Sequence, residues 1–221
     1  MITRRRMMLA LALGPAFRAW WSPGEFWNDK QPSEWAAKDI ERLLTKSPWA
    51  KEASPEMDFG RRGGPGMGPP GMEGRGRGGP GGPGGPGGGP PGMGAVVRWE
   101  SAAPIRDARK KKLPRDPAGS YVISVSGLRN MSDLGATLDA AGLDALKKAT
   151  SLQRTGKAAV APSHITMPFD EAGILLFYFP IGADPVSQED KQVIFQTRIQ
   201  AFGLKATFTP KDMMYRGSLA L

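Results

Sequence analysis

The only histidine, His164, is the side chain best suited to general base chemistry near neutral pH, and Ser163 stands directly before it. Adjacent residues of a strand point to opposite faces, so this serine and histidine cannot pair directly. The G-x-S-x-G pattern of a nucleophile elbow is absent from the sequence. Asp170 and Glu171 are acidic, but they lie in the turn sequence PFDEAG, where acids are common for conformational reasons. The pattern therefore favours a packed histidine over a catalytic one.

Charged and aromatic residues also gather around the segment VVRWESAAPIRDA, namely Arg98, Trp99, Glu100, Arg106 and Asp107. Such a cluster predicts local salt bridges near a sheet edge, or alternatively a recognition surface. The chain has no cysteine, which excludes disulfides, thiolate metal sites and a cysteine nucleophile. We predict no cofactor and find no catalytic motif, so whether the protein is an enzyme stays open. A hydrolase with a carboxylate pair that converges only in space is one alternative.

The net charge is +9 over 221 residues, and it is spread thinly. The one dense basic stretch runs from Arg109 to Lys112, and the sequence predicts no specific nucleic-acid binding. RGRGG at residues 75–79 resembles the RGG boxes of RNA-binding tails, but it carries few arginines and no interleaved aromatic residue. An RNA-binding protein using this tract is a second alternative.

The N-terminal residues 1–19 have the features of an export signal. Arg4, Arg5 and Arg6 precede the short apolar run MMLALAL, and small residues follow at Ala16 and Ala19. The apolar run is too short to span a bilayer, so we expect no transmembrane anchor after the signal is removed. The protein is expected in the periplasm or outside the cell. TRRRMML also loosely follows the twin-arginine pattern, so that route is possible.

Residues 60–94 consist mainly of glycine and proline and divide the rest of the chain. Such a composition buries too little apolar surface to offset the entropy of ordering, so we predict a disordered linker. The predicted organisation is a signal segment at 1–19, a Trp-rich helical head at 20–59, the linker at 60–94 and a body domain at 95–221.

The head contains Trp27, Trp35 and Trp49. A helix is predicted to begin at Ser33 and to end before Pro48, with Trp35, Ile40, Leu43 and Leu44 on one face. An isolated helix of this length is unstable in water, so its apolar face must dock, either on the body or on a partner. The candidate interaction residues are therefore Trp27, Trp35 and Trp49, together with Arg98 and Trp99.

The body is predicted to be an α+β fold, a mainly antiparallel sheet with one helical layer. Strands are expected over residues 95–101, 120–125, 158–167, 174–179, 192–199, 204–209 and 213–221, a short helix over 104–112, and a helical region over 132–152. Residues 174–179, ILLFYF, are apolar on both faces, which is typical of a central strand.

The segments SEWAAKDIERLLTKSPWAKE, VVRWESAAPIRDA, DKQVIFQTRI and KATFTPKDMMYRGSLAL together resemble a family of uncharacterised exported proteins from Acidobacteria. Members of that group also carry a Gly-rich insert between a head and a strand-rich body. The resemblance implies export and this domain layout, and it implies no activity. The sequence therefore predicts a non-catalytic binding or assembly module of the cell envelope, whose partner is an envelope protein.

Overall fold

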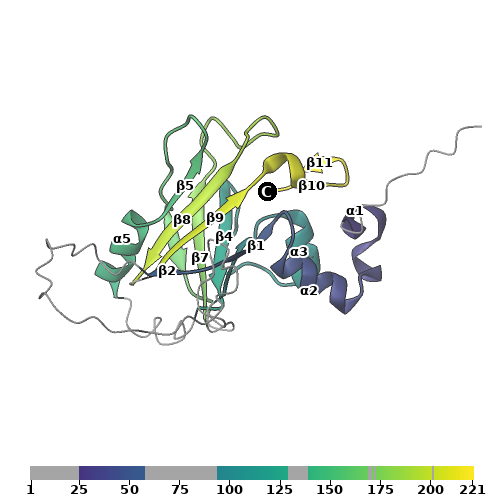
Figure 1. The fold of residues 1–221 in the computed structure, drawn as a ribbon, viewed down its shortest axis with the longest axis horizontal. Helices are drawn as coiled ribbons and strands as arrows, with labels where there is room; N and C mark the ends of the chain where they lie inside the picture. The colour runs from purple at the N-terminus through teal and green to yellow at the C-terminus, as the bar shows by residue number, and fades with distance from the viewer. Residues whose placement is uncertain (1–24, 58–93, 129–138, 169–170, 172, 201) are drawn as a thin grey trace, which may run out of the picture.

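The computed structural model describes residues 25–57, 94–128, 139–168, 171, 173–200 and 202–221. Two antiparallel sheets pack face to face, and short helices lie at both ends of this pair (Figure 1). The α+β class and the mainly antiparallel pairing are therefore confirmed. The expectation of a single sheet is wrong. The predicted signal segment at 1–19 and almost all of the predicted linker lie outside the described residues.

The first sheet has five strands in the order β1-β3-β4-β7-β6. They are β1 (Ala50–Ala53), β3 (Ala95–Trp99), β4 (Ser120–Ser126), β6 (His164–Thr166) and β7 (Ile174–Pro180). The second has four strands in the order β2-β9-β8-β5. They are β2 (Glu56–Met57), β5 (Ser151–Arg154), β8 (Val193–Ile199) and β9 (Phe202–Phe208).

Alternating side chains explain how the core is divided. Phe177 of β7 packs on Phe195 of β8, and Trp99 of β3 packs on Phe208 of β9, so aromatic rings from both sheets fill the space between them. Leu176 and Tyr178 point to the outer face of the first sheet and form a smaller buried cluster there with Val122. The apolar run at 174–179 is thus a central strand buried on both faces, as its composition predicts.

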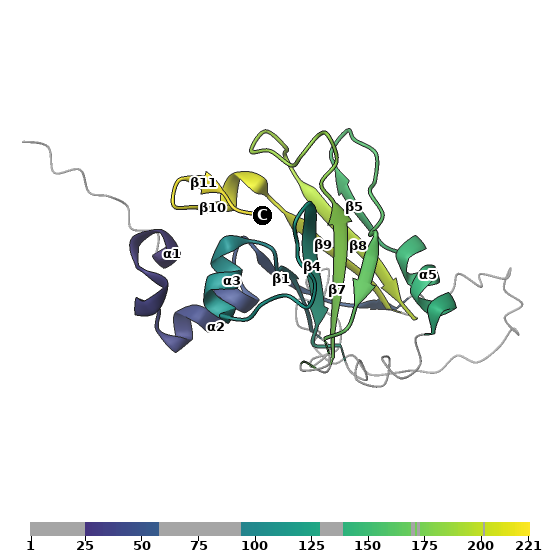
Figure 2. The same cartoon turned by 180° about the vertical axis from the view of Figure 1, so that it is seen from behind.

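Helical segments occupy the ends of the two-sheet core. They are α1 (Phe26–Asp29), a 3₁₀ turn (Pro32–Glu34), α2 (Ala37–Thr45), α3 (Ala103–Arg109), α5 (Ala140–Lys148) and a 3₁₀ turn (Pro210–Asp212). Figures 1 and 2 place α1, α2, α3 and the hairpin of β10 (Met214–Tyr215) and β11 (Ser218–Leu219) at one end, with α5 at the other.

The head begins differently from its prediction. The predicted helix start, Ser33, lies instead in a 3₁₀ turn that begins at Pro32. Trp35 is extended, so the α-helix begins only at Ala37. The side chains predicted to form the apolar face do point inward. Trp35 and Leu43 are buried in the core, and Ile40 and Leu44 are partly buried against it. The head therefore docks on the rest of this chain.

Three strand or helix boundaries also differ from expectation. The helix predicted over 132–152 ends at Lys148, and Leu152 belongs to strand β5. Residues 129–138 lie outside the described part. Strand β6 covers only three residues of the predicted 158–167. The strand predicted over 213–221 is a hairpin, because Arg216 and Gly217 have positive φ angles and turn the chain back.

The segment 50–57, expected in the head, contributes a strand to each sheet. Strand β1 pairs with β3 in one sheet, and β2 pairs with β9 in the other, with Pro55 between them. The register of β1 with β3 places Ala53 opposite Ala95. Residues 58–93 therefore connect β2, in the second sheet, to β3, in the first sheet.

Shortening this connection by half should leave the melting temperature of the protein nearly unchanged. The entropy of closing a loop varies only with the logarithm of its length, and the flanking strands stay paired through their own hydrogen bonds. Thermal unfolding of the full chain and of a variant lacking residues 76–92 tests this expectation. A drop of many degrees would show that the removed segment is packed structure.

Replacing Trp35 with alanine should destabilise the protein by about 3 kcal/mol, because a large buried ring leaves a cavity. Its ring contacts Phe26 and Tyr215, so the head and the C-terminal hairpin lose a shared contact. Urea unfolding measures the change. Lys38→Ala on the exposed side of α2 is the matched control and should change the free energy of unfolding by less than about 0.5 kcal/mol. Equal stability of Trp35→Ala and the parent would contradict docking.

Candidate functional site

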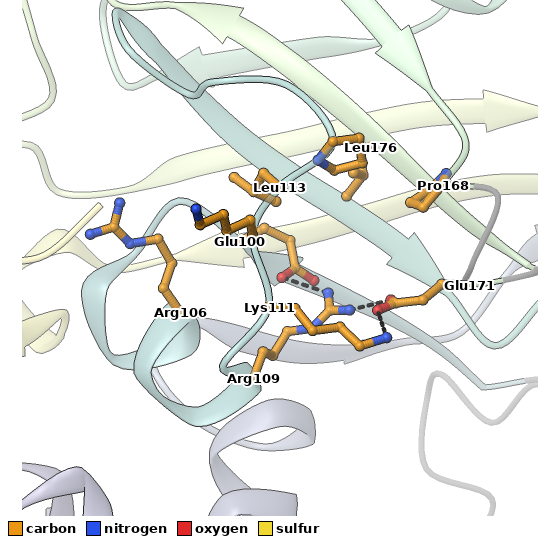
Figure 3. A pocket seen from close by; sticks show the side chains of 10 residues that line it. Glu100, Arg106, Arg109, Lys111, Leu113, Pro168, Glu171 and Leu176 are labelled. Carbon is orange, nitrogen blue, oxygen red and sulfur yellow. Dashed lines mark hydrogen bonds and ion pairs between the residues drawn. The ribbon is translucent and has the colours of Figure 1, made fainter.

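A buried carboxylate lies on the outer face of the first sheet. Glu100 directly follows β3, where the chain turns towards α3, and only 2% of its side-chain surface is exposed. Its Oε1 accepts hydrogen bonds from Arg98 Nε at 2.9 Å and Ser124 Oγ at 2.8 Å. Its Oε2 accepts one from Arg109 Nη1 at 2.9 Å (Figure 3). These charge-assisted bonds offset the cost of removing the carboxylate from water.

The same arginines extend the cluster to three other parts of the fold. Arg98 also donates to the carbonyl oxygen of Leu44 at 3.2 Å, in the last turn of α2. Arg109, at the end of α3, pairs with Glu171 in the turn before β7. Lys111 Nζ donates to Glu171 at 2.7 Å. We call the set Arg98, Glu100, Arg109, Lys111, Ser124 and Glu171 the Glu100 network.

The electrostatics of this network favour ion pairing over acid–base catalysis. Burial alone raises the pKa of Glu171, but hydrogen bonds from Lys111 and Arg109 outweigh it and hold that pKa below its usual range. Burial lowers the pKa of Arg109, yet the charge of Glu100 and the bond to Glu171 raise it overall. A general acid working near neutral pH needs a raised carboxyl pKa, which is the opposite shift.

The cavity beside the network is too small for a substrate. It holds about 30 Å³ and is lined by residues that include Arg109, Leu113, Pro168 and Leu176 (Figure 3). That volume suits about one water molecule, whereas small-molecule sites usually exceed about 300 Å³. The hydrolase alternative needs two carboxylates around a substrate. Here Glu100 and Glu171 both pair with Arg109, which lies between them.

The residues predicted for interaction all lie in the interior. Trp27, Trp35, Trp49 and Trp99 belong to one continuous apolar core, and Arg98 is buried in the Glu100 network. The structure thus brings the head tryptophans together with the body, and all of these residues are buried, although the edge of Trp27 lines an open groove. The charged cluster was predicted to form either local salt bridges or a recognition surface. Arg98 and Glu100 form a local salt bridge.

The histidine is not part of a nucleophile pair. The hydroxyl of Ser163 donates to the carbonyl oxygen of Tyr178 at 3.1 Å. The imidazole of His164 packs beside the ring of Tyr178, with centroids 5.8 Å apart. Burial lowers the pKa of His164, and the positive charges of Arg115 and Lys147 lower it further. These contacts agree with a packed histidine, while Asp170 lies outside the described residues.

Two hollows near these elements are open to solvent. A basic cleft of about 440 Å³ lies beside the Glu100 network, lined by Arg106, Lys111, Lys112, Leu113, Asp116 and Pro117. Arg106 and Lys112 form no ion pair within the described part of the chain. Part of the cleft lining, Lys111 and Lys112, belongs to the basic stretch at 109–112 that the sequence analysis identifies. Arg106 and Lys112 are thus its cations without an ion-pair partner among the described residues.

A larger hollow, which we call the head groove, has a volume of about 810 Å³. Its lining comes from three distant segments and consists of Glu25, Trp27, Arg42, Lys46, Ser47, Pro48, Ala50, Lys51, Glu52, Lys211, Asp212 and Met214. Sequence reasoning missed this groove, because nothing local relates residues 211–214 to residues 25–52. Trp27 was the one candidate interaction residue that lines the groove, and it does so as a largely buried side chain.

A third hollow of about 530 Å³ lies at the start of β4 and the ends of β5 and β7. Ion pairs line part of its edge. Arg154 Nη2 donates to Asp184 at 2.8 Å, and Lys157 Nζ donates to the same carboxylate at 2.6 Å. Arg154 also pairs with Asp190. Cations and carboxylates balance here, unlike in the basic cleft.

Comparison with known proteins adds no family to this geometry, since no family model, curated protein or solved structure matches the chain. Among the residues that the structure describes, no helix has both the length and the apolar character needed to cross a membrane.

Replacing Glu100 with glutamine should destabilise the fold by about 3 kcal/mol, because it leaves two buried arginines without their shared counter-charge. Urea unfolding provides the measurement. Glu52→Gln is the matched control, since Glu52 is exposed and pairs weakly with Lys46 at 3.8 Å, and it should cost less than about 1 kcal/mol. Similar losses in the two variants would contradict a structural role for the network.

The Glu171 pair should make stability depend on pH. Because the folded-state pKa of Glu171 is depressed, its contribution is fully present above the ordinary value of 4.5 and is lost as the pH falls through the folded-state pKa. The melting temperature of the parent should therefore exceed that of Glu171→Gln at pH 6, and this difference should shrink towards pH 3. A difference that stays constant over this range would refute the assignment.

Proposed function

We propose that this protein is a non-catalytic binding module of the cell envelope, exported to the periplasm or the cell exterior, and that its partner is an envelope protein. The N-terminal sequence features and the resemblance to exported Acidobacteria proteins support export. The head groove is the observation that carries the binding role. It is open, it has the size of a recognition site, and it is built from segments that the folded state brings together.

The charge pattern of the groove favours a protein partner. Arg42, Lys46, Lys51 and Lys211 line it, but so do the carboxylates of Glu25, Glu52 and Asp212. A nucleic acid or another uniform polyanion would meet these carboxylates as well as the cations. A protein surface carries both signs and can place each opposite its complement.

The fold supports a binding role for this end of the molecule in a second way. The head segments beside the groove are tied to the C-terminal segment, because Trp49 Nε1 donates to the carbonyl oxygen of Ala220 at 2.7 Å and Arg216 N donates to Asn28 Oδ1 at 2.8 Å. A site held in this way is largely formed before the partner arrives, which reduces the entropy lost on binding.

Site-specific photo-crosslinking in the cells that naturally produce the protein tests this proposal. A photoreactive amino acid replaces Lys46 or Lys211 in the groove, or Gln196 on the exposed face of the second sheet as the control. We expect a defined crosslinked product in the envelope fraction from the groove positions only. Recovery of the chain from the cytoplasm with Met1 intact, or equal crosslinking from Gln196, would contradict the proposal.

A further inference from the structure

Lys51 is a half-buried cation that lacks an ion-pair partner. It lies within β1 and lines the head groove. Among the described residues, no carboxylate lies within ion-pair distance of its ammonium group, although Asp212 is near enough to attract it. Burial lowers the pKa of Lys51 and outweighs that attraction. Lys111 and Lys157, by contrast, each contact a carboxylate at 2.7 and 2.6 Å respectively.

Trp27 forms part of the buried wall of the same groove. Its side chain is 5% exposed, and its indole N–H is buried without an acceptor in the described part of the structure. The neighbouring Trp49, whose ring lies 5.3 Å away, has its indole N–H bonded to Ala220. Trp35 and Trp99 also lack acceptors, but neither of them lines the groove. Because Trp35 and Trp99 share this state away from the groove, the unpaired N–H of Trp27 is not evidence of a ligand contact, but its place in the groove wall makes its resonance a reporter of binding beside Lys51.

We infer that the head groove binds a single carboxylate group of a protein partner, with the ammonium of Lys51 as its counter-ion. This inference rests on the proposed function and specifies the chemistry of that site. A carboxylate brings acceptor oxygens and the charge that Lys51 lacks. Glu25, Glu52 and Asp212 around the groove disfavour a run of acidic residues, so the recognised residue is an isolated Asp, Glu or C-terminal carboxylate. Pro48 and Met214 offer apolar contact to its neighbours.

A titration of the full-length protein with the α-amide of N-acetylglutamate, which carries a single carboxylate, tests the inference, and the indole N–H resonances in nuclear magnetic resonance spectra follow the binding. Trp27→Phe identifies the Trp27 signal. We expect this signal to shift saturably with the α-amide of N-acetylglutamate and not, at equal ionic strength, with the α-amide of N-acetylglutamine, which carries no carboxylate. Lys51→Met should weaken binding about tenfold or more, and Lys205→Met, which removes an exposed lysine on the second sheet, should leave it unchanged.

Lys51→Met should fold as well as the parent, since it removes a charge that burial disfavours, and its melting temperature checks this point. Absence of any saturable shift in the parent, or equal affinity in Lys51→Met, overturns the inference. The crosslinking experiment separates the two proposals. If groove positions crosslink and Lys51→Met does not reduce the yield, the proposed function stands and the carboxylate site fails. If no groove position crosslinks, the proposed function fails, whatever the titration shows.

Discussion

The buried carboxylate of Glu100 is the constraint that fixes the arrangement of this fold. Apolar packing between the two sheets is non-directional, and it does not by itself dictate where α2, α3 and the turn before β7 must sit. Glu100 does so, because Arg98 links it to the last turn of α2 and Arg109 links it to α3 and Glu171. Displacing Glu100 would leave Arg98 without its carboxylate and Arg109 with Glu171 alone, so alternative placements of these elements are costly.

The two ends of the described chain complete this arrangement by holding each other. Trp49 from the head donates to Ala220 near the C-terminus, and the hydroxyl of Tyr215 donates to Asp107 on α3. The head is therefore part of the same core as the two sheets. A long insertion between β2 and β3 is compatible with this core, because β2 is paired with β9 and β3 is paired with β1 and β4.

The sequence predicted what depends on local patterns. Local patterns located three strands almost to the residue, with alternation marking β8 and a continuous apolar run marking β7, and β4 was recognised from SYVISV. The apolar face of the head was recognised because Trp35 and Leu43 must be buried wherever they dock. It missed β1 and β2, since strands of four and two residues carry no period. The division into two sheets also depends on contacts between distant segments. For the same reason Arg98 and Glu100 were visible as a local cluster, whereas Ser124, Glu171 and the head groove were not.

The contrast between the charges that the fold uses and those that it leaves over is what points to function. At the Glu100 network and around Arg154, every cation that approaches the interior meets a carboxylate at close range. Lys51 enters a half-buried position without one, and it does so beside a tryptophan whose donor is also unsatisfied. A sequence selected only for stability would gain from an apolar residue at this position, because the ammonium is disfavoured by burial. Its presence is explained if a carboxylate arrives with a partner, so that Lys51 becomes paired only in the complex.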